Sequence, residues 1–543
     1  MKIMKRRTLL RNICSLLLIA VMILTFANVT ASADEPREVT SPCVTLAEED
    51  SGYVYDTVKM GTGIFGNFIP GTAPTETDNG CSLVFDVVFK VDPDTKELYS
   101  DILEDWYWED ESTLVMKMKD NIYFSNGENA TAEDLLYTYS SHADRGSAYV
   151  TEVKINYDKT EIRDDYTLAM NFDAFYSGFY AYKMYLIDKS WSESVGWDSL
   201  DWLQPVGSGP YAVTEYVMDD HITFTARDDY WNKDENPVKI REWYMKYYAD
   251  SATMAMDMEL GNIAMCAFTA VDYERFLKEG GDGYDVYAGP SGCCYIFQFG
   301  FLENDCWYDK NVREAFFYGI PWDEFGAVTL GTSYRPTHGF VPETSPEYID
   351  VGSYTYDLDK AKELLKEAGY DESNPLKIHT VMMDVSFYSK TCEAFEYYCS
   401  QMGVQFTYDL KDIPACVMDW NTLGGGCEVG WNFNNLGSVT QQFVQSMTFA
   451  GSDAGAKWAF VDDDVFVDLY NSASAETNEE KRIELSKQAQ QRLYDERLAV
   501  PYSECSYAVA YRTDVFTLDQ LRAGVMCNDY YNLTNISLAT NWE

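Results

Sequence analysis

The residues whose types and spacing are best suited to contact a ligand lie in the stretch "EVGWNFNN", residues 428–435. Gly430, Trp431, Asn432 and Asn434 follow the apparent end of a short strand, "CEVGW", and ligands of open α/β sheets bind beyond strand ends. An indole offers a broad apolar surface, and amides offer hydrogen-bond donors and acceptors. The set predicts a ligand-binding site. The alternative is that Trp431 only fills the core.

Motifs for other chemistries are weak or missing. Gly61–Gly66 matches the dinucleotide pattern GxGxxG, but Pro70, Gly71 and Pro74 follow and oppose the helix that this motif requires. The sequence has no P-loop, no GxSxG and no HExxH. Paired carboxylates would suit a secreted glycoside hydrolase, yet 88 acidic residues make such pairs by chance. We therefore expect a binding protein without a cofactor, and keep the hydrolase as an alternative.

The charge of the chain limits its partners. The 543 residues carry a formal net charge of -47, and the first 33 residues contain basic residues but no acidic ones. The chain that follows is therefore more acidic still. Such a surface repels phosphate backbones and anionic lipid head groups, so nucleic acid is not an expected partner.

The first residues have the pattern of a signal peptide. Basic residues up to Arg11 precede an apolar run at 15–26, and Ala31-Ser32-Ala33 matches a cleavage site. A retained membrane anchor is the alternative, but the run is short for a bilayer span of about 20 residues. We expect export, with a mature chain that starts near Asp34.

Cysteine and histidine spacing predicts no metal site. Twelve cysteines follow the leader, and an even number in an exported chain permits disulfides as well as buried thiols. None forms a CxxC pair or a cluster with the four histidines, so no metal ion is expected.

Hydrophobic periodicity predicts the elements that must position these residues. Residues 83–92 and 113–124 read as strands, and Thr131 with Asp134 reads as the start of a helix. The segments 211–217 and 221–226 predict a hairpin around Asp219-Asp220. The stretch 205–210, "PVGSGP", predicts a joint that allows close approach of two chain segments.

The second half alternates helices and strands. Leu358, Ala361, Leu365 and Ala368 share one helical face, and Gly369 would cap that helix. A strand at 376–384, a helix at 390–404 and a strand at 405–410 follow, and a long helix is expected at 478–496. This order predicts an α/β lobe with a partly parallel sheet.

Five blocks of the chain form a further pattern: 98–139 ("LYSDILEDWYW…TAEDLLYTY"), 205–231 ("PVGSGPYAVTEY…DDYW"), 310–320 ("KNVREAFFYGI"), 356–370 ("YDLDKAKELLKEAGY") and 499–504 ("AVPYSE"). In content and order these blocks resemble the family 5 extracellular solute-binding proteins, the oligopeptide and dipeptide receptors of ABC importers. The resemblance covers nearly all of the chain after the leader.

The resemblance implies an α/β periplasmic-binding-protein-like fold of type II, with two hinged lobes and an inserted α+β domain. The implied division is a signal peptide at 1–33, lobe I at 34–80, 205–305 and 495–543, the inserted domain at 81–204, and lobe II at 306–494. The implied partners are a small-molecule ligand held between the lobes, and the permease and ATPase subunits of an ABC transporter. The protein would act in the periplasm or at the cell surface, at the outer face of the cytoplasmic membrane.

The resemblance also implies further ligand contacts by position. Tyr149 corresponds to a segment where the inserted domain approaches the ligand, and Asn79 and Cys81 correspond to a segment that runs beside it. Tyr295 alternates with Phe297 and Phe299 on one strand face, which would line the crevice or pack the lobe.

One position departs from the family pattern. In peptide receptors that the chain resembles, the block Gly-Trp-x-x-Asp places an aspartate against the peptide α-amine, and Asn434 stands there in this sequence. A hydrogen bond to a charged group contributes about 1.5–3 kcal/mol, against about 1 for a neutral one. Either another acid near the cleft binds the amine, or the ligand is an oligosaccharide held by Asn432, Asn434 and Gln441. Peptides are the leading expectation, and nickel chelates are less favoured because histidines are few.

Overall fold

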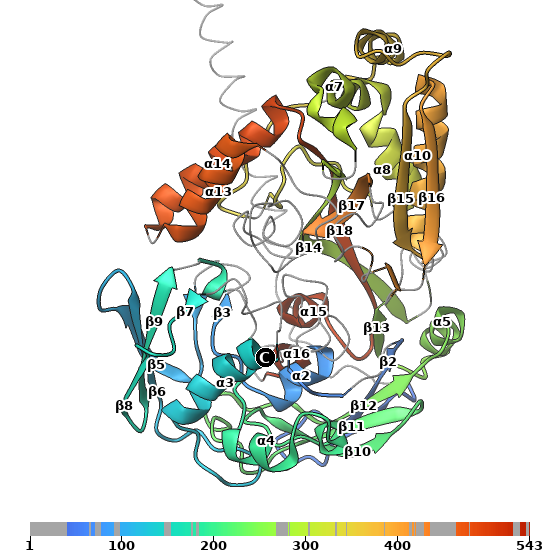
Figure 1. Ribbon diagram of the computed structural model, residues 1–543. Helices are drawn as coiled ribbons and strands as arrows, with labels where there is room; N and C mark the ends of the chain where they lie inside the picture. The colour runs from blue at the N-terminus through green and yellow to red at the C-terminus, as the bar shows by residue number, and fades with distance from the viewer. Residues whose placement is uncertain are drawn as a thin grey trace, which may run out of the picture. The chain divides into compact units, whose positions relative to one another are not determined.

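Figure 1 shows the computed structural model of the chain. It describes residues 41–63, 67–70, 78–91, 98–145, 154–174, 177–180, 184–267, 281, 283–301, 304–331, 334–343, 345–353, 355–384, 386–411, 415–416, 419, 428–434, 463–476, 478–524, 533–538 and 542. By its internal contacts the chain divides into residues 1–41 and 42–543, and every element below belongs to the second unit. Among the described residues no helix is long and apolar enough to cross a membrane.

The described strands form one large sheet and three smaller ones. The large sheet has nine described strands, in the order β10-β11-β12-β2-β13-β18-β14-β17 with β1 paired to β2. Its strands are β1 (Val44–Leu46), β2 (Tyr55–Thr62), β10 (Tyr211–Val217), β11 (His221–Ala226), β12 (Ile240–Tyr247), β13 (Met265–Ala267), β14 (Tyr284–Phe299), β17 (Val429–Asn434) and β18 (Ala499–Arg512).

The smaller sheets come from other parts of the chain. One contains β5 (Leu103–Trp108), β6 (Thr113–Met118), β7 (Lys154–Ile155), β8 (Glu161–Asp164) and β9 (Thr167–Ala174). The others pair β3 (Lys90–Val91) with β4 (Leu98–Tyr99), and β15 (Lys377–Met383) with β16 (Gln405–Lys411). The β15 and β16 strands are parallel, as are β12 and β13 with β2.

Several described helices pack against these strands, among them α2 (Asp78–Val84) on β10 and α10 (Ser386–Met402) on β15 and β16. The described α-helices are α2 (Asp78–Val84), α3 (Ala132–Asp144), α4 (Lys189–Val195), α5 (Ser251–Glu259), α7 (Lys310–Gly319), α8 (Trp322–Leu330), α9 (Leu358–Glu367), α10 (Ser386–Met402), α13 (Asp464–Ala475), α14 (Glu479–Asp495), α15 (Leu518–Gly524) and α16 (Leu533–Ser537). Three described 3-10 turns accompany them, at Ser177–Tyr180, Leu200–Leu203 and Asp305–Tyr308. In Figure 1, α13 and α14 lie side by side, and α10 lies along β15 and β16.

Most predicted elements are confirmed, together with their local signals. Thr131 donates from its backbone N–H to Asp134 (2.8 Å) at the start of α3, as the capping pattern predicted. The hairpin forms as β10 and β11, with Asp219 at a φ of 58° in the turn. The helix α9 ends where Gly369 adopts a φ of 93°. The partly parallel pairing expected for the second half is present between β15 and β16.

The strand predicted at 83–92 is wrong. Residues up to Val84 are helical, and only Lys90 and Val91 pair as a strand. The run is apolar because it is buried among irregular segments: Val88 donates its backbone N–H to Met184, and Leu186 donates to Asp86. A short apolar run does not distinguish a ladder strand from buried irregular chain, since both exclude polar side chains.

The glycines of the 205–210 joint serve close approach, as predicted. A Cβ added to Gly207 would overlap the carbonyl oxygen of Val84, and one added to Gly209 would overlap the same peptide unit. Gly209 donates its N–H to the Val84 oxygen at 2.8 Å. The chain then enters the large sheet at Tyr211 as β10. These glycines therefore permit the joint to pack directly on the end of α2.

Candidate ligand-binding site

The tryptophan stretch forms β17 at the edge of the large sheet, beside the long strand β14. Asn434 pairs with Cys294, and the register runs without a break to Val429. The strand was predicted to end at Trp431, but it continues to Asn434, so both predicted amides belong to the ladder. The structure thus brings Gly430, Trp431, Asn432 and Asn434 next to Tyr295 on two paired strands. The side chains of 431–434 lie outside the described part of the chain.

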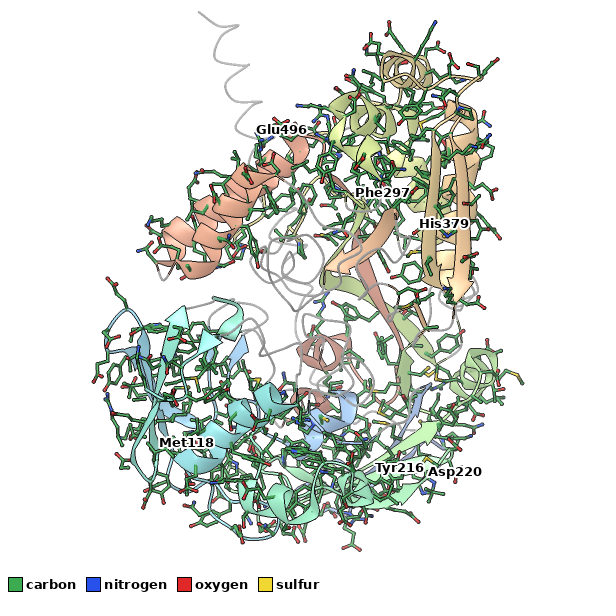
Figure 2. All side chains as sticks on the ribbon, in the orientation of Figure 1. Met118, Tyr216, Asp220, Phe297, His379 and Glu496 are labelled. Carbon is green, nitrogen blue, oxygen red and sulfur yellow. The ribbon has the colours of Figure 1, made fainter. Side chains whose placement is uncertain are left out.

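The position of Trp431 pairs with a residue of the core. Its partner in the register is Phe297, which is fully buried. Figure 2 labels Phe297 among the side chains of this part of the chain. The ring centroid of Phe297 lies 5.1 Å from that of Trp322 and 5.2 Å from that of Phe395. Directly opposed residues of an antiparallel pair share one face of the sheet. The register places position 431 on the face of the sheet that carries Phe297, and the predicted role of Trp431 stays a prediction.

Tyr295 differs from the other aromatic residues of its strand face. Phe297 and Phe299 are buried, whereas Tyr295 is half-buried, with its ring centroid 6.1 Å from that of Tyr502. The expectation that Phe297 and Phe299 pack the core agrees with this burial. Tyr295 keeps a partly open surface and pairs with Phe433, whereas Asn434 pairs with Cys294, the preceding residue of β14, which points to the opposite face of the sheet.

Asn79 and Cys81 lie on a different element, the helix α2. Cys81 is buried with 2% exposure, and the neighbouring Gly80 faces the rings of Phe68 and Phe224. The helix α2 packs against β10 and α16. Tyr149 lies outside the described residues, so its predicted role stays a prediction.

The register also reveals Glu504 on β18, which our reading of the sequence missed. Glu504 pairs with Cys294, the same residue that pairs with Asn434 from the other side. Its carboxylate accepts the backbone N–H of Glu343 at 2.6 Å. Burial, followed by the charge of Glu343, raises the pKa of Glu504, although Arg335 opposes this. The signal available in the sequence was an acid that ends the otherwise uncharged strand block "AVPYS".

A separate polar cavity of about 150 Å³ lies at the end of α2. Asp86 lines it and accepts hydrogen bonds from Trp231 (2.9 Å) and Tyr230 (3.2 Å), and burial raises the pKa of Asp86. Lys90 and Asp101 form an ion pair at its wall. Ligand pockets usually enclose about 300–1,000 Å³. This cavity is therefore too small for a peptide, and its charged groups already have partners.

Metal chemistry has no candidate among the described residues. No group of three or more His, Cys, Asp or Glu side chains in that part of the chain is placed to hold an ion. Three of the described cysteines, Cys306, Cys392 and Cys399, are buried thiols outside any disulfide. Burial raises the pKa of each thiol, that of Cys392 to about 12, which disfavours the thiolate that metals bind.

Comparison of the sequence with known proteins identifies a family that matches this chain. The family model described as "Bacterial extracellular solute-binding proteins, family 5 Middle" matches residues 97–425. The chain is 24% identical over 429 residues to the dipeptide-binding protein DppE of Bacillus subtilis, an alignment that covers 72% of this chain and 76% of that protein.

Several solved structures share the fold, and two of them illustrate the similarity. The ABC transporter-associated periplasmic binding protein DppA of Helicobacter pylori, in complex with the peptide STSA, has a TM-score of 0.71 at 17% identity and covers 88% of this chain and 97% of its own. NikA of Brucella suis, in complex with Fe(III)-EDTA, has a TM-score of 0.74 at 18% identity and covers 89% and 99%. These likenesses confirm the predicted type II binding-protein fold.

The family model alone spans more than half of the sequence, and it includes four of the five predicted blocks in full. The fifth block, 499–504, lies on β18 beside β14. The chain therefore belongs to family 5 of the bacterial extracellular solute-binding proteins.

Proposed function

We propose that the protein is the substrate-binding component of an ABC importer, which captures oligopeptides or dipeptides by hinge closure and delivers them to a permease. The observation that carries this proposal is the family match over 97–425, supported by the similarity to DppE along 72% of the chain. The named relatives are binding proteins, so no bond-breaking step is assigned. An oligosaccharide ligand and a hydrolase activity gain no support from these relatives.

The long strands β14 and β18 supply a candidate hinge. They pair antiparallel from Tyr284 with Arg512 to Gln298 with Ala499, but the register shifts between Pro290 and Cys294. An interrupted ladder bends more easily than a continuous one, because the unpaired residues lack cross-strand hydrogen bonds. We place the bending point of closure at this interruption.

Closure is driven by contacts that exist only when both lobes hold the ligand. To shift an equilibrium from 1:99 to 99:1, a ligand must bind the closed form about 10⁴-fold more tightly than the open form. A site on one lobe alone cannot provide this difference. The importer would then recognise the closed form, and the permease and ATPase subunits are the partners that the proposal requires.

The domain boundaries predicted from the sequence are part of this proposal. The sheet of β5 to β9 falls within 81–204, the range assigned to the inserted domain, and the chain joins the large sheet at Tyr211. Residues 1–33 would be removed on export to the periplasm or the cell surface. Limited proteolysis with mass spectrometry tests both points: cuts near 204 and a mature start near Asp34 are expected.

Calorimetry and small-angle scattering on the purified mature chain test the function. We expect saturable binding of short peptides at one site per chain, with a decrease in the radius of gyration. A matched set of oligosaccharides should give neither signal. The absence of a binding signal with peptides, or the hydrolysis of any oligosaccharide, would contradict the proposal.

A further inference from the structure

A lysine and two carboxyl groups meet in the polar cavity at the end of α2. Lys90 donates its Nζ to Asp101, and their side chains are only 11% and 27% exposed. Asp86 lines the same cavity and is 4% exposed. Two opposite charges that are taken out of water carry a desolvation penalty that can exceed their attraction. An amide between Lys90 and Asp101 would be neutral, so burial favours it over the two charges.

The local chain holds the amine against the carboxyl group. Lys90 lies on β3, and Asp101 follows β4, the strand that pairs with β3. Both neighbours of Asp101 are fixed, because Ser100 donates its hydroxyl to the Val88 oxygen at 2.6 Å and Ile102 is fully buried. Groups held in contact within one molecule react as if their concentration were as high as about 10⁵–10⁸ M. The pair is therefore placed to react without a chance encounter.

Asp86 is suited to exchange the protons that amide formation requires. Burial raises the pKa of Asp86, although Lys90 opposes this, so burial favours its neutral, proton-carrying form. Its two oxygens are held by Trp231 at 2.9 Å and by Tyr230 at 3.2 Å. A positioned group that gives and takes a proton accelerates a reaction by about 10²–10⁴-fold. The cavity thus contains a nucleophile, an acyl group and a proton donor.

We propose that Lys90 and Asp101 form an intramolecular amide bond, with Asp86 as the proton relay. Asp101 and its neighbours outweigh burial and raise the pKa of Lys90, so the ammonium must first pass a proton to the Asp101 carboxylate. The neutral amine then attacks Cγ of Asp101, and a C–N bond forms. One carboxyl oxygen takes the proton of Asp86 and leaves as water, and Asp86 recovers a proton from the new nitrogen.

The reaction is complete in itself. An ammonium and a carboxylate become an amide and one water, the net charge of the pair stays zero, and no oxidant or further reactant is consumed. The cavity of about 150 Å³ has room for the released water, which needs about 10–15 Å³. The bond would close the β3–β4 hairpin covalently. It does not depend on the proposed receptor function.

Mass spectrometry of a tryptic digest of the denatured wild-type chain tests the bond. An amide on Lys90 blocks cleavage after it, so residues 60–96 should stay joined to residues 97–117, at their summed mass less one water. Without the bond, trypsin releases 60–90, 91–96 and 97–117 separately. A succinimide at Asp101 also loses water but leaves the peptides separate. The internal control is the 2.8 Å pair of Lys246 and Asp257: Lys246 is 41% exposed, and trypsin should cleave after it.

Two variants separate the reaction from the packing. Lys90→Arg keeps the charge but has no nucleophilic amine, so it should give the separate peptides. Asp86→Asn keeps an acceptor for Trp231 but cannot relay a proton, so the linked fraction should fall at least about tenfold. Separate peptides from the folded wild type after prolonged incubation would overturn the proposal, and linkage of Asp86→Asn at the wild-type level would overturn the role of Asp86. Should Asp86→Asn not fold by circular dichroism, Asp86→Glu keeps the acid and should link; its failure to link when folded would overturn that role equally.

Discussion

At the scale of single residues, Gln298 is an unusual member of the sheet. It lies on β14 between Gly430 and Ala499, with 2% exposure, and within the described part of the chain neither its amide nitrogen nor its amide oxygen has a hydrogen-bond partner. A buried polar group without a partner costs about 1–3 kcal/mol. Gln298 thus lowers the stability of the sheet.

Gln298→Met should therefore raise the free energy of unfolding by about 1–2 kcal/mol, because methionine fills a similar volume without unmet polar atoms. Urea denaturation measures the shift of the midpoint at constant slope. The matched control is Gln490→Met: Gln490 is equally buried but donates to the Glu347 oxygen at 2.7 Å, so this change should destabilise by about 1–3 kcal/mol. Equal effects of the two variants would contradict the argument.

Gly207 offers a second test at this scale. Any side chain there meets the backbone of Val84, which is held by the N–H of Gly209 and cannot retreat freely. Gly207→Ala should lower the free energy of unfolding by about 1–3 kcal/mol or more. Gly63→Ala is the control, since nothing lies within 4 Å of a Cβ at Gly63. A melting temperature for Gly207→Ala equal to that of the wild type would show that the joint is loosely packed.

At the scale of elements, α13 and α14 are joined by one charged contact. Asp463 caps the N-terminus of α13 by accepting the Phe466 N–H at 2.8 Å, and Arg492 of α14 binds both its oxygens, at 3.0 and 2.7 Å. Burial opposes the charged form, but these hydrogen bonds dominate and lower the pKa of Asp463. One carboxylate thus holds a helix end and a helix pair together.

Asp463→Asn should cost about 1–2 kcal/mol, because asparagine still caps the helix but loses the charge, and Asp463→Ala should cost about 1 kcal/mol more. Chemical denaturation at neutral pH measures both. The wild type should show a matching pH dependence: the contribution is complete above the ordinary aspartate value of 3.8 and is lost as pH falls through the lowered folded value. Equal stability of the Asn variant and the wild type would show that only the cap matters.

Elements with their own local signals were predictable, and elements defined by tertiary contacts were not. Thr131 with Asp134, and Gly369 after an amphipathic turn, mark helix ends through bonds within a few residues, so the sequence contains the whole signal. The run at 83–92 has no such signal. Its backbone hydrogen bonds join it to Met184 and to the 205–210 joint, which are both distant in the sequence. Glu504 was missed for the same reason. Its position beside Cys294, in the same row as Asn434, depends on the register of three strands.

At the scale of the whole molecule, the order of five sequence blocks identified the fold, while the ligand stayed open. The solved structures that share the fold hold ligands as different as a peptide and Fe(III)-EDTA. The shared fold therefore does not determine which ligand is bound.

The acidic surface makes a last prediction about rates. A net charge of -47 should draw cationic peptides toward the protein and repel acidic ones. Salt screens this attraction, with a Debye length of about 20 Å near 20 mM salt and about 4 Å near 500 mM. The association rate of a tripeptide with two lysines should therefore fall about tenfold or more over this range in stopped-flow fluorescence, while its dissociation rate changes little. A tripeptide with two glutamates should associate faster as salt rises, which controls for general salt effects on closure. If both peptides respond alike, the charge acts on the conformational step and not on encounter, and steering by the surface is ruled out.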